Sequence, residues 1–199
     1  MAGLRDTLRQ HLQGRVAFVG LGNPLFGDDG FGVAAAQRLQ AMGIPNVFVA
    51  GQWPERCLDS MAGMDHVVFL DAVDAGLEPG SVIWMDSEAL RSRFPQVSTH
   101  RISLGLLAEY LQKAGTAHVW LLGVQPCSVP EPVEGTEAHG AFVEGPTRVC
   151  SGPFDRLRGR EEVKGWDGEA LSEPVAQALE TVVEALKGAC ALSREAGSP

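Results

Sequence analysis

The sequence predicts an α/β domain built around a mostly parallel β-sheet, and two observations support this. Short apolar runs typical of buried strands alternate along the chain with longer segments whose apolar residues recur at helical spacing. The chain of 199 residues is 45% hydrophobic, which is enough to bury one full core. We therefore expect residues 1–199 to form a single domain.

The most distinctive stretch of the chain is its first strand, loop and helix. Residues 16–19 are β-branched and aromatic and predict a buried strand, whereas residues 33–42 are rich in alanine and leucine and predict a helix. The loop between them, residues 20–32, contains five glycines and the adjacent acids Asp28 and Asp29. Glycines allow left-handed backbone angles and a close approach of the backbone to another group.

This glycine-rich loop has three interpretations. A dinucleotide site is disfavoured, because the glycine spacing fails at Leu25 and because two carboxylates at a helix start repel a pyrophosphate. In a second interpretation, Asp28 or Asp29 simply caps the helix. In the third, one acid caps the helix while the other faces a crevice above the sheet and holds a cation or a water.

The remaining elements continue the alternation. The link at residues 71–80 is too short for a crossover helix, so the strand that follows it is expected to run antiparallel at an edge. Apolar runs predict strands at residues 46–50, 66–70, 81–85 and 118–122, and helical patterns predict helices at 54–62, around 104–111 and at 172–187, besides a short helix or frayed arm at 1–13.

Two stretches break the alternation. Residues 127–164 are rich in proline, glycine and charge, and we expect a flexible insertion there rather than a second domain. This insertion is either a specificity element or tolerated disorder. Residues 191–199 are expected to form a disordered tail.

Composition excludes several classes of partner. The net charge of −9 argues against nucleic acids and anionic membranes. No apolar run approaches the roughly 20 residues that span a bilayer, and the first residues do not resemble a signal peptide. The four cysteines have neither zinc-site spacing nor the context of a disulfide framework. We therefore expect reduced thiols in a cytoplasmic protein.

Two of the acids are expected to meet at one end of the sheet. In open α/β sheets, ligands bind beyond the carboxyl ends of the strands, near the point where the strand order reverses. Asp29 follows the first strand, and Asp71 ends the strand predicted at residues 66–70, so both should face one crevice. Either acid could instead be structural, with Asp71 bonding to its own loop or capping together with Asp74.

His100 is the third candidate, because it lies just before the helix predicted around residues 104–111. The positive end of a helix dipole disfavours the imidazolium, and a neutral imidazole is what metal coordination requires. A histidine in this place is also often a cap or a surface residue. Asp29, Asp71 and His100 together would form a weak three-ligand site for a divalent ion such as nickel, zinc or manganese. An ion that arrives already held by another molecule would suit such a site.

The motifs around these residues resemble those of the nickel–iron hydrogenase maturation endopeptidases. Four motifs carry the resemblance in order along the chain: Gly-Asn-Pro-Leu-Phe-Gly-Asp-Asp-Gly-Phe-Gly at 22–32, Phe-Leu-Asp-Ala-Val-Asp-Ala-Gly at 69–76, Ser-Thr-His at 98–100, and Leu-Gly-Val-Gln-Pro at 122–126. The resemblance covers about residues 15–122 and resumes at residue 166. The family's three metal-contacting positions correspond to Asp29, Asp71 and His100.

The resemblance implies a fold, an activity and a substrate. It implies a three-layer α/β/α domain whose five-stranded mixed sheet has the order 2-1-3-5-4, with strand 4 antiparallel. It also implies a cytoplasmic, metal-dependent endopeptidase with catalytic aspartates. Such an enzyme removes a C-terminal peptide from the precursor of a hydrogenase large subunit after nickel insertion. The nickel is carried by the substrate and serves as the recognition signal, rather than being a resident cofactor.

The chain departs from the family pattern at two places. After the second strand it has Ala50-Gly51-Gln52, where the family commonly has an acidic residue and paired glycines. This difference predicts a difference from the family in substrate fit or activity. The insertion at 127–164 is also longer than the usual connection.

Two other functions remain open. A nickel-dependent chaperone would hold the large-subunit precursor without cutting it. A hydrolase similar to peptidyl-tRNA hydrolase shares the Gly-Leu-Gly-Asn-Pro opening, but that family follows the proline with a glycine, and the acidic charge of this chain does not suit tRNA.

Overall fold

The computed structural model describes residues 3–93, 103–127 and 171–195. These residues form a five-stranded sheet with the order β2-β1-β3-β5-β4, as expected. Neighbouring strands pair in parallel, except that β4 runs antiparallel to β5 at the edge. The strands are β1 (Val16–Leu21), β2 (Val47–Gly51), β3 (His66–Ala72), β4 (Val82–Asp86) and β5 (His118–Val124).

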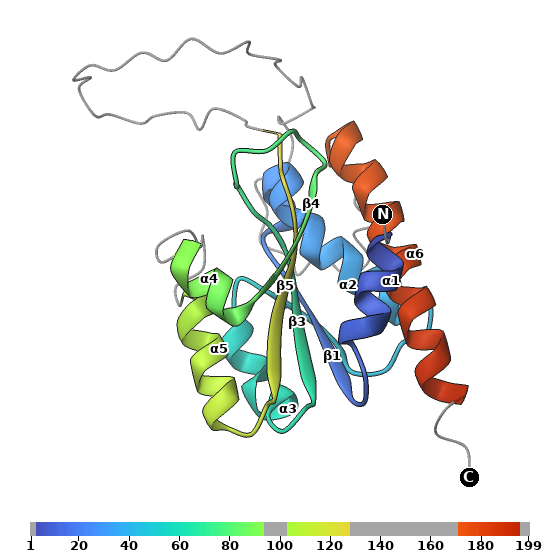
Figure 1. Ribbon diagram of the computed structural model, residues 1–199. Helices are drawn as coiled ribbons and strands as arrows, with labels where there is room; N and C mark the ends of the chain where they lie inside the picture. Colours follow the sequence, from blue (N-terminus) through green and yellow to red (C-terminus); the bar gives the residue numbers. More distant parts are fainter. Residues whose placement is uncertain (1–2, 94–102, 128–170, 196–199) are drawn as a thin grey trace, which may run out of the picture.

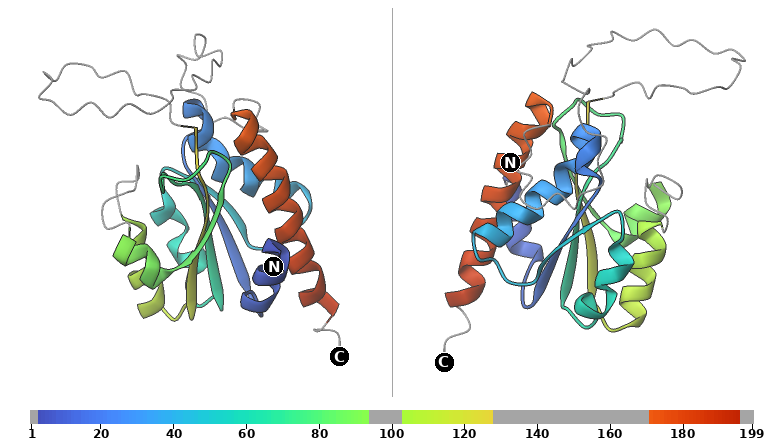
Figure 2. Two further views of the ribbon diagram at one scale, coloured as in Figure 1. Left: turned by 45° about the horizontal axis from the view of Figure 1, so that its top comes forward. Right: turned by 180° about the vertical axis from the view of Figure 1, so that it is seen from behind.

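Helices cover both faces of the sheet and give three layers (Figures 1 and 2). One face carries α1 (Leu4–His11), α2 (Phe31–Ala41) and α6 (Glu173–Glu195), and the other carries α3 (Leu58–Met61), α4 (Ser87–Arg93) and α5 (Leu104–Lys113). β3 shows why both layers form, because its side chains alternate between the faces. Val68 and Leu70 pack into the first core, while Val67 and Phe69 pack into the second.

The helices differ from the sequence predictions in three details. The helix predicted at residues 54–62 is a 3₁₀ turn, η2 (Pro54–Cys57), followed by the single turn of α3. Helix α4 and the 3₁₀ segment η1 (Pro24–Gly30) were not predicted. Helix α6 continues past the predicted end at residue 187 and includes residues 191–195 of the segment expected to be a tail.

Some expectations concern residues that lie outside the described ranges. They include His100, most of the proposed 127–164 insertion, Cys150 and residues 196–199. Within the described ranges Cys57, Cys127 and Cys190 are not joined in disulfides. Among the helices described, none combines the length and the apolar character needed to cross a bilayer.

Candidate active site

Asp29 lies in η1, which connects the carboxyl end of β1 to α2. The loop is not a regular helix, since Phe26 and Gly27 have non-helical angles and Gly27 has a φ of 58°. Local hydrogen bonds hold it instead. The side chain of Asn23 accepts the N–H of Leu25 at 3.0 Å, and Oδ2 of Asp29 accepts the N–H of Asn23 at 2.6 Å. The half-buried Asp29 carboxylate is therefore oriented by its own loop.

The glycines of this region serve close packing. A Cβ atom on Gly32 would lie 2.6 Å from the carbonyl oxygen of Leu21, and closer still to that of Leu70. A Cβ on Gly22, whose φ is 101°, would collide with the carbonyl oxygen of Asp29. The first turn of α2 therefore rests directly on the ends of β1 and β3. These contacts explain why glycine is required at positions 22 and 32.

Asp71 lies near the carboxyl end of β3, and its side chain is only 5% exposed. The alternation of the strand places it on the face that α5 covers, two residues after Phe69. It pairs in register with Gly123 of β5. Leu70, against which Gly32 packs, immediately precedes Asp71, and η1 contacts β3. The fold thus brings the Asp29 loop and Asp71 to the carboxyl end of the sheet. The shared crevice expected for the two carboxylates stays a prediction.

His100 lies outside the described residues, so its position relative to the two carboxylates stays a prediction. The described chain resumes at Ser103, whose hydroxyl caps α5 by accepting the N–H of Leu106 at 3.3 Å. Within the described ranges, no group of three or more histidine, cysteine, aspartate or glutamate side chains lies close enough to hold a metal ion. Of the three predicted ligands Asp29, Asp71 and His100, His100 lies outside those ranges.

Asp28 differs sharply from its neighbour. It is 8% exposed, and its carboxylate accepts hydrogen bonds from Cys127 and Ser172. Two of the three interpretations of the loop had Asp28 or Asp29 cap the helix, but the N-cap of α2 is Gly30, so neither acid occupies that position. The structure gives Asp28 the structural contacts, although its partners lie in distant segments rather than in the adjoining helix.

Sequence reasoning missed the role of Gln125 beyond the end of β5. Gln125 is 2% exposed, and its Oε1 accepts the N–H groups of Ala75 at 2.8 Å and Leu77 at 3.1 Å. Its Nε2 donates to Oδ1 of Asp74 at 3.0 Å. These hydrogen bonds hold the loop that follows Asp71 close to the end of β5. The Leu-Gly-Val-Gln-Pro motif was the available signal, but the sequence did not identify the partners.

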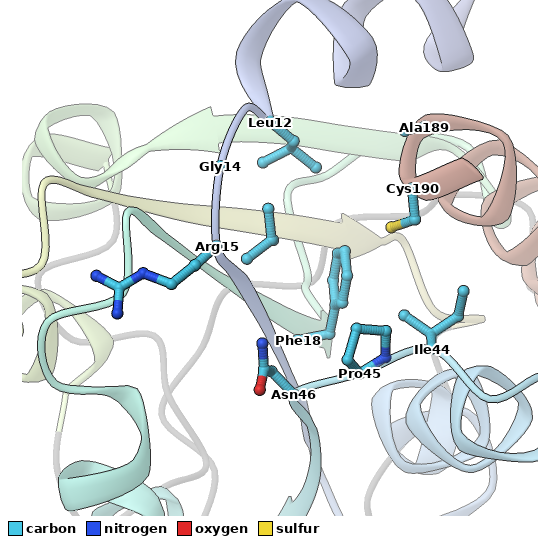
Figure 3. A pocket seen from close by; sticks show the side chains of 10 residues that line it. Leu12, Gly14, Arg15, Phe18, Ile44, Pro45, Asn46, Ala189 and Cys190 are labelled. Atoms are coloured by element: carbon cyan, nitrogen blue, oxygen red, sulfur yellow. The ribbon is translucent and has the colours of Figure 1, made fainter. Parts of the chain in front are cut away.

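A pocket of about 210 Å³ lies at the opposite end of β1 (Figure 3). Arg15 and Phe18 line it together with Cys190 of α6, and most of the remaining wall comes from the segments that precede β1 and β2. Near this end of the sheet, the Nε1–H of Trp120 donates to Nδ1 of His66 at 3.1 Å. Burial, and then the neighbouring His118, lowers the pKa of His66. This end of the sheet is separate from the predicted site.

The model of the hydrogenase maturation protease family HycI matches residues 33–138, which is more than half of the chain. The chain belongs to this family. Its members are named as proteases, so the predicted class of enzyme, a peptide-bond hydrolase, is confirmed at the level of the family. The matched range includes Asp71 and His100 and begins just after the loop that carries Asp29.

Individual relatives of this family agree with the match. The hydrogenase 3 maturation protease of Escherichia coli K12 is 28% identical over 145 residues, which are 62% of this chain and 92% of that protein. A Methanocaldococcus jannaschii protein named as a putative hydrogenase maturation protease is 36% identical over 80 residues, or 38% of this chain. Only 52% of the length of that relative is matched.

Solved structures of maturation proteases share the fold. The crystal structure of the protease HycI from Thermococcus kodakarensis superposes with a TM-score of 0.64 and 26% identity, covering 92% of this chain and 98% of that chain. The maturating endopeptidase HybD from E. coli has a TM-score of 0.56 at 22% identity, covering 92% and 94%, and shows likeness of fold alone.

Proposed function

We propose that this protein cleaves a C-terminal peptide from the nickel-loaded precursor of a hydrogenase large subunit. The nickel is part of the substrate, and Asp29, Asp71 and His100 complete its coordination. Besides membership of the family, one structural observation supports this proposal. The packing of Gly32 on Leu70 brings the loop of Asp29 to the end of the strand that carries Asp71. We propose that the two carboxylates, which come from distant parts of the sequence, bind one ion there.

The donor types suit this role. Carboxylate and imidazole ligands bind borderline divalent ions such as nickel, and three protein ligands leave coordination positions for groups that the substrate supplies. Binding the ion through the protein holds the neighbouring peptide bond beside the crevice, and such positioning supplies a large part of the rate in many enzymes. A cation at this place also polarises a carbonyl or lowers the pKa of an attacking water.

The environment of Cys57 disfavours this residue as a nucleophile. Burial, followed by the nearby carboxylate of Glu55, raises the pKa of this thiol above its ordinary value. A protonated thiol is a poor nucleophile. Cys57 is therefore a poor candidate for the nucleophile, and attack by a water is part of the proposal.

Exposed apolar side chains offer a surface for a polypeptide next to the proposed site. Leu25 and Phe26 of η1 are 41% and 63% exposed and precede Asp29 in the same loop. Exposed apolar residues that cluster beside a functional loop commonly mark a binding surface. We propose that the precursor contacts them. We also propose that the reaction takes place in the cytoplasm, where a thiol such as that of Cys57 stays reduced.

Incubation of the purified protein with nickel-loaded and nickel-free precursor tests the proposal, with mass spectrometry as the readout. The expected result is loss of a C-terminal peptide only from the nickel-loaded precursor. Asp29→Asn, Asp71→Asn and His100→Ala should each abolish the loss, whereas Asp59→Asn, which changes an exposed acid of α3, should not. Nickel-dependent binding without any mass loss would favour the chaperone. Cleavage that ignores nickel would refute the recognition step.

A further inference from the structure

The Asp28 carboxylate joins three segments that are far apart in the sequence. Its Oδ1 accepts the backbone N–H of Ser172 at 2.7 Å. Its Oδ2 accepts both the Ser172 hydroxyl at 2.8 Å and the backbone N–H of Cys127 at 2.8 Å. These partners lie 144 and 99 residues further along the chain. Because Asp28 is almost fully buried, water cannot readily replace the bonds if they are lost.

The partners belong to the elements that surround the proposed site. Cys127 follows β5 closely, and Ser172 immediately precedes α6, whose Ala176 N–H bonds back to the carbonyl oxygen of Ser172 at 2.8 Å. Figure 1 shows that α2 and α6 both begin at the end of the sheet where the parallel strands finish. The hydrogen bonds of Asp28 therefore connect η1 both to the segment after β5 and to the start of α6.

The η1 loop depends on hydrogen bonds to other elements. η1 is interrupted by non-helical angles at Phe26 and Gly27, so a continuous helical hydrogen-bond ladder does not hold it. The Asn23 contacts organise only the interior of the loop. Asp28 supplies bonds from η1 to other elements, directly beside Asp29 in the chain.

We propose that Asp28 is a positioning residue that holds the Asp29 carboxylate in register with Asp71. This inference rests on the proposed function, because it assigns Asp29 a part in the reaction. Asp28 itself does not touch the substrate in this account. Its buried bonds fix the backbone from which Asp29 projects, and a displacement of about 1 Å in such a group can lower a rate by about a hundredfold.

Asp28→Asn tests the inference with little change in side-chain volume. The amide has one oxygen and one NH₂ group, so one backbone N–H, that of Ser172 or that of Cys127, must face a donor in either orientation. We expect kcat for the nickel-loaded precursor to fall by about ten- to a hundredfold, while KM changes by less than about twofold. Rates are measured per folded molecule, with circular dichroism giving the folded fraction at the assay temperature.

Ser172 provides a milder second variant if Asp28→Asn fails to fold. Ser172→Ala removes the hydroxyl bond and leaves both backbone bonds, so kcat should fall by about fivefold. Ser172→Thr keeps the hydroxyl and should restore the rate. Ser60→Ala in α3 removes an exposed hydroxyl and serves as the matched control, with an unchanged rate.

The outcomes separate the inference from the proposed function. A residue with only a structural role would lower the melting temperature and leave kcat per folded molecule unchanged. That result for Asp28→Asn overturns the inference, and Ser172→Ala decides in the same way if Asp28→Asn does not fold. The proposed function still stands in that case, provided that Asp29→Asn is inactive. Full activity of Asp29→Asn, or an inactive wild-type protein, overturns the proposed function and the inference with it.

Discussion

Replacement of Gly32 by alanine should weaken both the fold and the proposed activity. In a helix, alanine is favoured over glycine by up to about 1 kcal/mol, so helix propensity alone predicts stabilisation. At Gly32 the added Cβ would lie 2.6 Å from the carbonyl oxygen of Leu21 and closer to that of Leu70, whereas real Cβ atoms essentially never approach within 3.0 Å. Both obstacles are strand backbone, so α2 has to move away from β1 and β3.

The expected cost follows from this forced displacement. Overpacking of a well-packed interior costs about 1–3 kcal/mol, which outweighs the gain in helix propensity. At about 2–4 °C for each kcal/mol in a protein of this size, the melting temperature should fall by several degrees. Because η1 leads directly into α2, the shift also carries Asp29 away from Asp71, and processing should fall by about tenfold or more.

Urea denaturation followed by tryptophan fluorescence measures the change in stability. The matched control is Gly188→Ala in α6, which is also a helical glycine. A Cβ there meets chiefly the flexible side chain of Arg5, with Nε at 2.8 Å. It should be neutral or stabilising. If Gly32→Ala were as stable and as active as Gly188→Ala, the claim that the tight contact between α2 and the strand ends positions the site would be refuted.

Three further predictions concern residues around the sheet. Burial lowers the pKa of His66 below its unfolded value of about 6.5, so the unfolded state binds more protons at acidic pH and the free energy of unfolding should decrease as the pH falls below about 6.5. Urea titrations at pH 8 and pH 5.5 check this, and an equal decrease in His66→Gln would contradict it. Gln125→Ala should cost about 1–3 kcal/mol in the same titration, because Ala75 and Leu77 each lose a buried acceptor; an unchanged midpoint would contradict the role of Gln125. Phe26→Ser should leave stability within about 0.5 kcal/mol and raise the KM for the precursor at constant kcat, so an unchanged KM would exclude Phe26 from the binding surface.

The sheet could be predicted from sequence because its signals are local or topological. The run at His66 to Leu70 has the apolar character of a strand buried on both faces, and it forms the buried strand β3. The short link after Asp71 predicted an antiparallel β4, which the structure confirms. The convergence of the Asp29 loop and Asp71 at one edge followed from the reversal of strand order.

The elements that were missed lack such signals. η1 changes conformation within seven residues, so its sequence shows neither helical nor strand periodicity. Helix α4 is short, and its start depends on Asp86, whose carboxylate accepts the N–H of Ala89 at 2.8 Å. The contacts of Asp28 could not be inferred, since their partners lie far along the chain and meet it only in the folded protein.

X-ray absorption at the nickel edge tests the central claim most directly. The sample is the complex of the protein with nickel-loaded precursor whose cleavage site has been blocked, compared with that precursor alone. The account predicts additional oxygen and nitrogen ligands on nickel in the complex, and fewer of them with Asp29→Ala or Asp71→Ala. An identical coordination shell in the free and bound precursor would contradict the claim that both carboxylates bind one substrate ion.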